Sequence, residues 1–172
     1  MAPSFVQSRT LWVVVALIVG LGLGGFLPHA PLHAVATDHT DNFAMATGLV
    51  DDELEAVFIL DFLTGSLKCA VLSTSTGKFT SAFETSVLDD LGVKANQNPK
   101  FMMVTGAAGL RRQGGQMQPG NSVVYVAETT SGRIAAYAVP WTRGLATSVM
   151  PFKGTLYRLD ALPFRTAPIR PQ

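Results

Sequence analysis

The sequence has little of what most catalytic and metal sites are built from. It contains one cysteine, Cys69, and three histidines, and none of the histidines lies after His39. A single cysteine excludes an intrachain disulfide and a cysteine metal cluster, and a hydrolytic triad would need a histidine within the folded region. We therefore expect no enzyme activity, no bound metal and no cofactor.

An excess of charge of one sign is also missing. The 172 residues include 13 Lys and Arg against 12 Asp and Glu, a formal net charge of +1. Proteins that bind nucleic acid neutralise phosphates with clustered basic side chains. The near balance of charge therefore excludes nucleic acid as an expected partner.

A long apolar run is present near the N-terminus, where residues 11–27 carry no charge. This length is at the short end of what spans a bilayer as a helix. We predict a single transmembrane signal-anchor helix at 11–27, with residues 1–10 as a cytoplasmic tail and residues 28–42 as a juxtamembrane linker. The membrane is therefore one expected partner.

The flanking charges set the orientation of this helix. Arg9 precedes the run, and no Lys or Arg follows it until Lys68. Because positive charge stays on the cytoplasmic side, we expect a single-pass protein of the cell membrane with its C-terminal domain outside the cytoplasm. The alternative is a signal peptide cleaved after Ala36, in the small-residue triplet Ala34-Val35-Ala36, which would release a secreted protein.

The rest of the chain contains an internal repeat. Residues 43–48 (FAMATG) return as 101–106 (FMMVTG), and residues 57–67 return as 124–134. Internal repetition indicates a repeated structural unit. The predicted organisation is a first β repeat, a linker, a second β repeat with one terminal strand, and a disordered tail, at residues 43–83, 84–100, 101–160 and 161–172.

Each repeat reads as four strands. The first begins with a strand at 43–47 that ends at Gly48, followed by a strand at 56–60 whose continuous apolar run predicts burial on both faces. In the second repeat, Pro140 and Trp141 should end the third strand, because proline cannot donate to a strand ladder. The fourth strand of this repeat is expected at 146–150, and a terminal strand at 155–159.

Two hairpin turns occupy equivalent places in the repeats. Asp61 and Gly65 flank the first turn, and Glu128 and Gly132 flank the second. We interpret the acidic residues as acceptors for the backbone N–H groups of the turn, and the glycines as positions that need a positive φ. All four are predicted to have structural roles.

Two loops are candidates for binding. Arg111 and Arg112 lie in a long loop rich in Gly and Gln and form its local cluster of positive charge. Because long loops often carry function, we consider them a candidate partner-binding loop for an acidic partner or anionic headgroups. The acidic stretch 51–55 could alternatively bind a cation.

The phrase formed by 57–67, an apolar run followed by Asp61 and Thr64-Gly65, resembles the blades of quinoprotein or YVTN-type β-propellers. That resemblance extends over 43–83 and 101–150 and implies a mainly β fold. Propellers close with about four to eight blades, whereas this chain has two, so no cofactor-binding residue is implied.

Two lone blades would expose apolar faces and strand edges. The two units could therefore pack face to face as an antiparallel sandwich or partly closed barrel, copies could complete a ring, or a partner could cover the open face. We expect the first for a single chain. The predicted function is a non-enzymatic interaction or structural module with a protein partner or a homo-oligomer. A ligand-binding or cation-binding sensor is the alternative.

Overall fold

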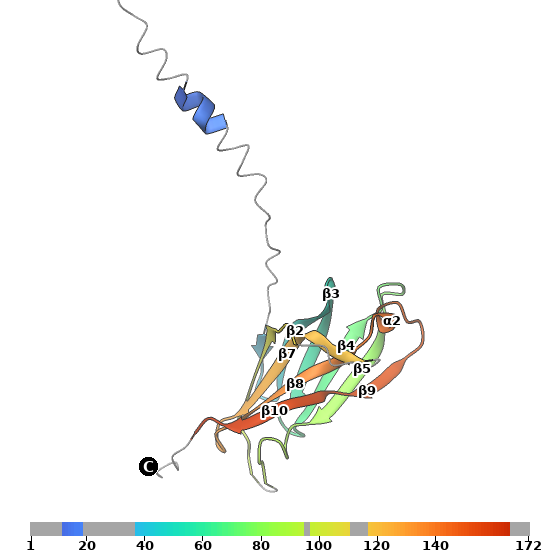
Figure 1. Cartoon of the computed structure of the whole chain (residues 1–172). Helices are drawn as coiled ribbons and strands as arrows, with labels where there is room; N and C mark the ends of the chain where they lie inside the picture. The colour runs from blue at the N-terminus through green and yellow to red at the C-terminus, as the bar shows by residue number, and fades with distance from the viewer. Residues whose placement is uncertain (1–11, 19–36, 95–96, 111–116, 166–172) are drawn as a thin grey trace, which may run out of the picture. The chain divides into compact units, whose positions relative to one another are not determined.

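The computed structural model describes residues 12–18, 37–94, 97–110 and 117–165 (Figure 1). The chain divides into two units, Met1–Ala34 and Val35–Gln172. In the first unit, residues 12–18 are helical and exposed. The remainder of the expected transmembrane segment lies outside the described residues. None of the described helices combines the length and the apolar character that crossing a membrane requires.

The described part of the second unit is mainly β-strand, with one short helix. In chain order these elements are β1 (Thr37–His39), β2 (Phe43–Asp51), β3 (Leu54–Asp61), β4 (Ser66–Leu72), β5 (Phe79–Ser86), β6 (Phe101–Ala107), β7 (Gln118–Glu128), β8 (Arg133–Trp141), α2 (Arg143–Ala146), β9 (Phe152–Thr155) and β10 (Tyr157–Pro163).

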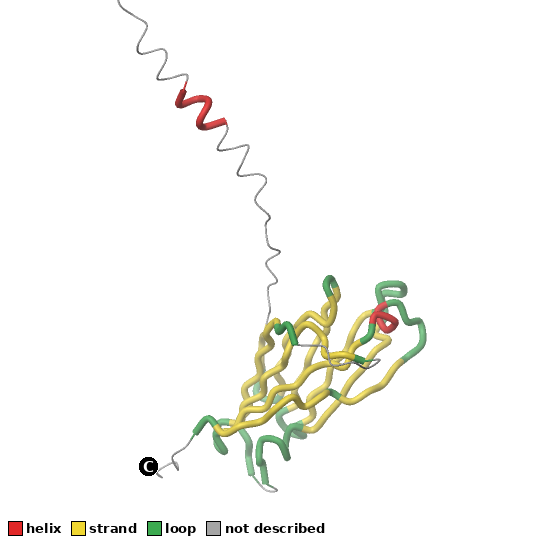
Figure 2. Tube along the Cα trace, in the orientation of Figure 1, coloured by secondary structure: helices red, strands yellow, loops and turns green. Residues whose placement is uncertain are grey.

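The strands form two sheets that face each other as layers (Figure 2). The first sheet has the order β1-β2-β3-β4-β5-β9, and the second has the order β10-β8-β7-β6. Neighbouring strands are antiparallel except for β5 and β9, which are parallel. The sheets do not close into a barrel. The expected mainly β domain of two sheets is therefore confirmed.

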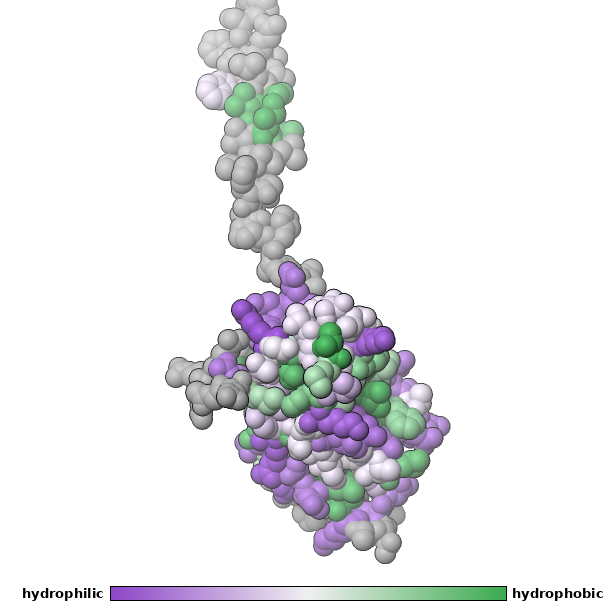
Figure 3. Space-filling view, turned by 90° about the vertical axis from the view of Figure 1, so that its right-hand side faces the viewer, coloured by the Kyte–Doolittle hydropathy of each residue, from purple (hydrophilic) through white to green (hydrophobic). Residues whose placement is uncertain are grey.

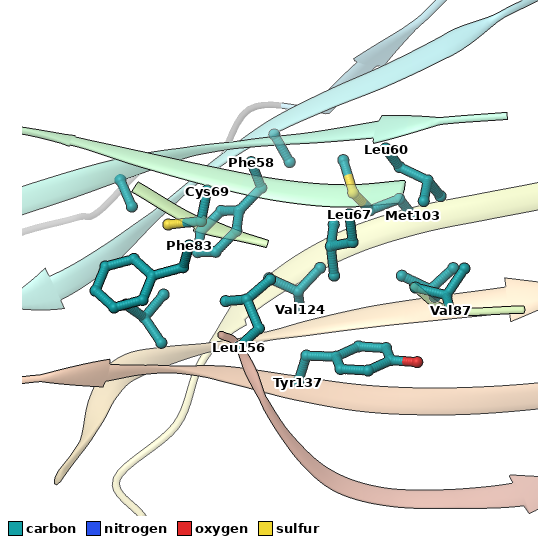
Figure 4. Packing of buried hydrophobic residues seen from close by; sticks show 14 of the residues in the cluster. Phe58, Leu60, Leu67, Cys69, Phe83, Val87, Met103, Val124, Tyr137 and Leu156 are labelled. Carbon is teal, nitrogen blue, oxygen red and sulfur yellow. The ribbon is translucent and has the colours of Figure 1, made fainter. Parts of the chain in front are cut away.

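The core lies between the two sheets (Figure 4). Phe58, Leu67 and Cys69 of the first sheet point toward Val124 and Tyr137 of the second, and all are at most 2 % exposed. Burial of Cys69 raises the pKa of its thiol, because the thiolate would lose its hydration. This cysteine is therefore a core residue, as its apolar neighbours in the sequence predict.

The ladder register repeats between the sheets. Phe43 lies opposite Asp61 in the first sheet, and Phe101 lies opposite Glu128 in the second. The following hairpins match as well, because Asp61 lies opposite Ser66 and Glu128 lies opposite Arg133. Strands β2, β3 and β4 therefore correspond to β6, β7 and β8 residue by residue, with the correspondence that the sequence repeat indicates.

The fourth strand breaks this correspondence, and the prediction for it is wrong. Residues 146–150 form no strand, because 143–146 are the short helix α2 and a loop follows. The chain then adds β9 to the far edge of the first sheet, beside β5. It returns to the second sheet as β10, which pairs with β8 and takes the place of the fourth strand.

Several predicted boundaries also need correction. Strand β2 continues past Gly48 to Asp51, so the acidic loop shrinks to a tight turn at Asp52-Glu53. Pro140 lies inside β8, opposite Pro119 of β7, where two residues without an N–H face each other. At the ends of the domain, β1 falls within the expected linker 28–42, and β10 extends to Pro163 into the expected tail.

Strand β3 is buried on one face only, which corrects the prediction of burial on both faces. Phe58 and Leu60 are fully buried, whereas Ile59 between them is 38 % exposed. An antiparallel sheet at the surface of a two-layer domain has one solvated face. The apolar run is continuous because Ile59, on the solvated face, is also apolar.

The segment between the repeats closes one end of the core rather than acting as a free linker. Val87 and Leu91 are fully buried in the core cluster. Asp90 accepts hydrogen bonds from the Tyr137 hydroxyl and from Arg158 Nη1, both at 2.8 Å. The segment thereby ties β8 and β10 to the chain that leaves the first sheet.

Candidate interaction surfaces

The first of the two equivalent hairpin turns is held by Asp61. Its Oδ1 accepts hydrogen bonds from the backbone N–H of Leu63 at 2.8 Å and of Thr64 at 3.3 Å. The hydrogen bonds from Thr64 and Leu63 lower the pKa of the Asp61 carboxyl and outweigh the opposing effect of burial. Gly65 follows with φ of +65°, a conformation that L side chains rarely adopt.

Glu128 holds the second turn in the same way, but its carboxylate accepts hydrogen bonds from three backbone N–H groups rather than two. Its Oε1 accepts from the backbone N–H of Lys100 at 3.0 Å and of Thr130 at 2.9 Å, and its Oε2 accepts from the N–H of Ser131. Burial alone would raise the pKa of Glu128, but these hydrogen bonds outweigh it and hold the pKa at about 2. Gly132 has φ of +67°.

Both carboxylates are occupied by backbone N–H groups of the fold rather than directed into a binding cavity. Arg111 and Arg112, the candidate partner-binding residues, lie outside the described residues. The four turn residues therefore provide turn geometry, and a site for a partner has to be sought elsewhere on the described surface.

The outer face of the second sheet carries the clearest unexplained feature. Two neighbouring ladder rows among those that cross all four strands on this face are considered together: Met102, Ala127, Ile134 and Leu162, and next to them Val104, Tyr125, Ala136 and Asp160. Met102 is 61 % exposed and Val104 52 %. Asp160 is the single charged residue in these two rows. We call these eight residues the apolar face.

The second sheet is thus apolar on both sides. Its inner rows contain Met103, Val126 and Tyr137, which are buried in the core cluster. A surface sheet usually alternates apolar and polar residues, with the polar ones outside. Contiguous exposed apolar residues of this kind mark places where another molecule binds.

The outer face of the first sheet is mixed. Its rows contain Met45, Ile59, Lys68 and Glu84, and next to them Thr47, Val57, Ala70, Ala82 and Lys153. Lys68 and Glu84 approach to 3.7 Å. A hollow of about 410 Å³ lies here, lined by Val57, Ile59 and Ala70 among others. We call these nine residues the mixed face. Hydrophobic and hydrophilic residues are likewise interspersed on the side of the β domain shown in Figure 3.

Comparison of the repeats reveals that corresponding residues lie on opposite faces. Phe58 and Cys69 are buried in the first sheet, whereas their counterparts Tyr125 and Ala136 belong to the apolar face of the second. Conversely, Met45 is 51 % exposed, whereas its counterpart Met103 is 4 % exposed. The apolar face therefore corresponds to the core face of the first sheet.

A polar cleft of about 410 Å³ lies at one end of the domain. It is lined by Asp51, Asn121 and Arg143, with Trp141 beside them. Arg143 approaches Asp51 to 3.9 Å and Asp52 to 3.7 Å, and the Trp141 indole donates to Asp51 at 3.3 Å. Asp51 and Asp52, two of the acidic residues that suggested a cation site, thus lie within ion-pair distance of Arg143.

Within residues 37–94, 97–110 and 117–165, no three His, Cys, Asp or Glu side chains are grouped as a metal site would need. No family model matches the chain, and neither the curated proteins nor the solved structures compared with it include a match. The resemblance to propeller blades stays a prediction. The apolar face was not predicted from the sequence. The stretches 123–127 and 134–139 contain no charged residue, and this pattern could have indicated it.

Proposed function

We propose that this protein is a membrane-tethered interaction module that acts outside the cytoplasm and binds a protein partner through the apolar face of its second sheet. One observation carries the proposal: the second sheet is apolar on both sides, while only one side is covered by the first sheet. The tether is the uncharged run 11–27, and its orientation follows from the charges that flank it.

A protein fits this face better than a membrane surface does. The face offers Met102, Val104 and Tyr125 for contact and contains no Lys or Arg. Surfaces that bind anionic lipid add basic residues to their apolar contacts. Interface cores between proteins, in contrast, are depleted of charge and enriched in Tyr and Met.

The test is crosslinking of the tagged full chain after solubilisation in mild detergent, with mass spectrometry of the captured proteins. Val104→Lys places a charge in the middle of the face and should lower recovery of the partner by about tenfold or more. Thr76→Lys is the matched control, because Thr76 is also exposed but lies on the β4–β5 turn, and it should leave recovery unchanged. Equal recovery with both variants would refute a role for this face.

The polar cleft supports a second candidate, a sensor for a small ligand or a cation. The supporting observation is the set of hydrogen-bonding groups around the cleft: Asp51, Asn121 and Arg143. Under this function, CaCl2 at millimolar concentration would raise the unfolding temperature of the wild-type chain but not that of Asp51→Asn. A flat response in both chains would exclude calcium as the ligand.

A further inference from the structure

We propose that the partner of the apolar face is a second copy of this chain, which contributes the mixed face of its first sheet, so that copies associate head to tail. This inference rests on the proposed function and names the occupant of the same surface. It follows from the exchange of faces between the two repeats.

The contact between the sheets within one chain provides the template. There, the row of Phe58 and Cys69 in the first sheet packs against the row of Val124 and Tyr137 in the second (Figure 4). In the repeat, Phe58 corresponds to Tyr125 of the apolar face. Val124 corresponds to Val57 of the mixed face. The two exposed faces are therefore counterparts of the two halves of an interface that the fold already makes.

The residue types on the mixed face, and Phe43 at its margin, support this assignment. Phe43, Met45, Thr47 and Val57 have the counterparts Phe101, Met103, Thr105 and Val124, each of the same residue type. Phe43 is 46 % exposed and Phe101 is 8 % exposed. Phe101 and Met103 are thus buried between the sheets, whereas their counterparts Phe43 and Met45 are exposed to solvent.

Shape and charge also agree. Tyr125 projects from the apolar face, and the hollow on the mixed face is lined by Ile59 and Ala70. The single charge of the apolar face, Asp160, lies on β10, at the edge away from β6. Lys153 of the mixed face lies on β9, at the edge away from β2. Stacking in the template orientation brings these opposite charges to the same side.

The exposed side chains of the apolar face supply a large part of the area that one partner contributes to a standard interface. Met102, Val104, Tyr125 and Leu162, together with Tyr157 at the margin, are each between 38 % and 61 % exposed. Together they offer roughly 400–500 Å² of largely apolar surface, and backbone and small residues add to it, against roughly 800 Å² per partner in a standard interface. Membrane tethering would raise the local concentration of copies further.

The two faces belong to different sheets, on opposite sides of the sandwich, so the contact is heterologous. Such contacts produce closed rings or open chains of copies rather than two-fold dimers. Each contact between the two sheets of one chain therefore predicts one contact between neighbouring copies, and these predicted residue pairs can be tested.

The closest approach between the two sheets that is useful for such a test is at Gly48, which lies against Ser122. A Cβ at Gly48 would lie 3.0 Å from the Cβ of Ser122. Gly106 is the counterpart of Gly48, and Glu55 is the counterpart of Ser122. Gly106 of one copy should therefore lie beside Glu55 of the next, within the reach of a disulfide.

The experiment mixes two full-length chains in mild detergent, one carrying Gly106→Cys and the other Glu55→Cys, with different tags and a mild oxidant. The native Cys69 is buried and should stay unreactive. The mixed disulfide dimer is expected in at least about tenfold excess over that from the control mixture of Gly106→Cys with Thr76→Cys. Tyr125→Lys should shift the wild-type oligomer to monomer in light scattering.

Each outcome decides the inference. The mixed dimer together with a monomeric Tyr125→Lys chain supports it. A disulfide between two Gly106→Cys chains would show a symmetric contact and overturn it, as would a monomeric wild-type chain. If the wild-type chain is monomeric while Val104→Lys still abolishes capture of another protein, the proposed function stands and only the head-to-tail inference fails.

Discussion

Replacing Glu128 by Gln should destabilise the domain and should do so in a pH-dependent manner. The carboxylate is 2 % exposed and accepts three backbone N–H groups, from Lys100, Thr130 and Ser131. Gln can accept at one oxygen only, so its amide group would face a backbone N–H and leave one donor unpaired. Loss of a charge-assisted hydrogen bond with an orphaned buried donor costs about 2–3 kcal/mol.

The lowered pKa of Glu128 gives a second measure of the stabilisation that these same hydrogen bonds provide. In the folded chain the pKa of Glu128 is about 2, against an ordinary value of 4.5. Because the folded value is depressed, the carboxylate stabilises the fold above pH 4.5 and loses that contribution as the pH falls toward 2. The full contribution is about 3 kcal/mol, and about 2 kcal/mol of it is lost between pH 5 and pH 3.

The assay is urea unfolding in non-ionic detergent, followed by the fluorescence of Trp141 in a Trp12→Phe background. The free energy of unfolding of wild type minus that of Glu128→Gln should shrink by about 2 kcal/mol from pH 5 to pH 3. Asp61→Asn, at the equivalent turn, is the matched control and should show a smaller change, because its two acceptor contacts are solvent-exposed. A difference that is constant with pH would refute the assignment of the low pKa to Glu128.

Two further predictions concern the turns and the segment that closes the core. Gly65 and Gly77 share a φ of +65°, but a Cβ at Gly65 would lie 2.4 Å from Leu88, whereas nothing lies within 4 Å at Gly77. Gly65→Ala should therefore lower the unfolding temperature more than Gly77→Ala, which costs only about 1 kcal/mol of backbone strain; equal losses would contradict the steric argument. Tyr137→Phe removes the hydrogen bond to Asp90 and should cost about 1–2 kcal/mol in urea unfolding; an unchanged midpoint would show that water replaces the hydroxyl.

The parts of the fold that local sequence determines were predictable. The spacing of Thr64-Gly65 and Ser131-Gly132 after apolar runs indicates hairpins, and the structure has a positive-φ glycine at both. The correspondence of 43–48 with 101–106 yields the ladder register of both sheets, because register follows from turn position and from the alternation of side chains.

The fourth strand of the second sheet was not predictable in the same way. Residues 146–150 have the composition of a strand but no partner, since the short helix α2 turns the chain away from β8. Pairing of β9 with β5 joins residues about seventy positions apart. Local propensity does not encode contacts of that sequence separation, so the excursion to the first sheet and the return as β10 had no local signal.

The choice of which face of each repeat is buried depends on what the repeats pack against. Phe58 and its counterpart Tyr125 have the same place in their ladders, yet one lies in the core and the other at the surface.

If two identical sheets stack in the same orientation, the front of one must cover the back of the next, and one front and one back are left over. Two repeats therefore always leave one face of each sheet uncovered, and a single chain can satisfy only one of the two contacts that its repeated unit encodes. In this chain the uncovered front is the apolar face, with one charge in eight residues, and the uncovered back still carries Phe43 and Met45. Under the proposed head-to-tail association, these two uncovered faces are the ones that neighbouring copies would cover.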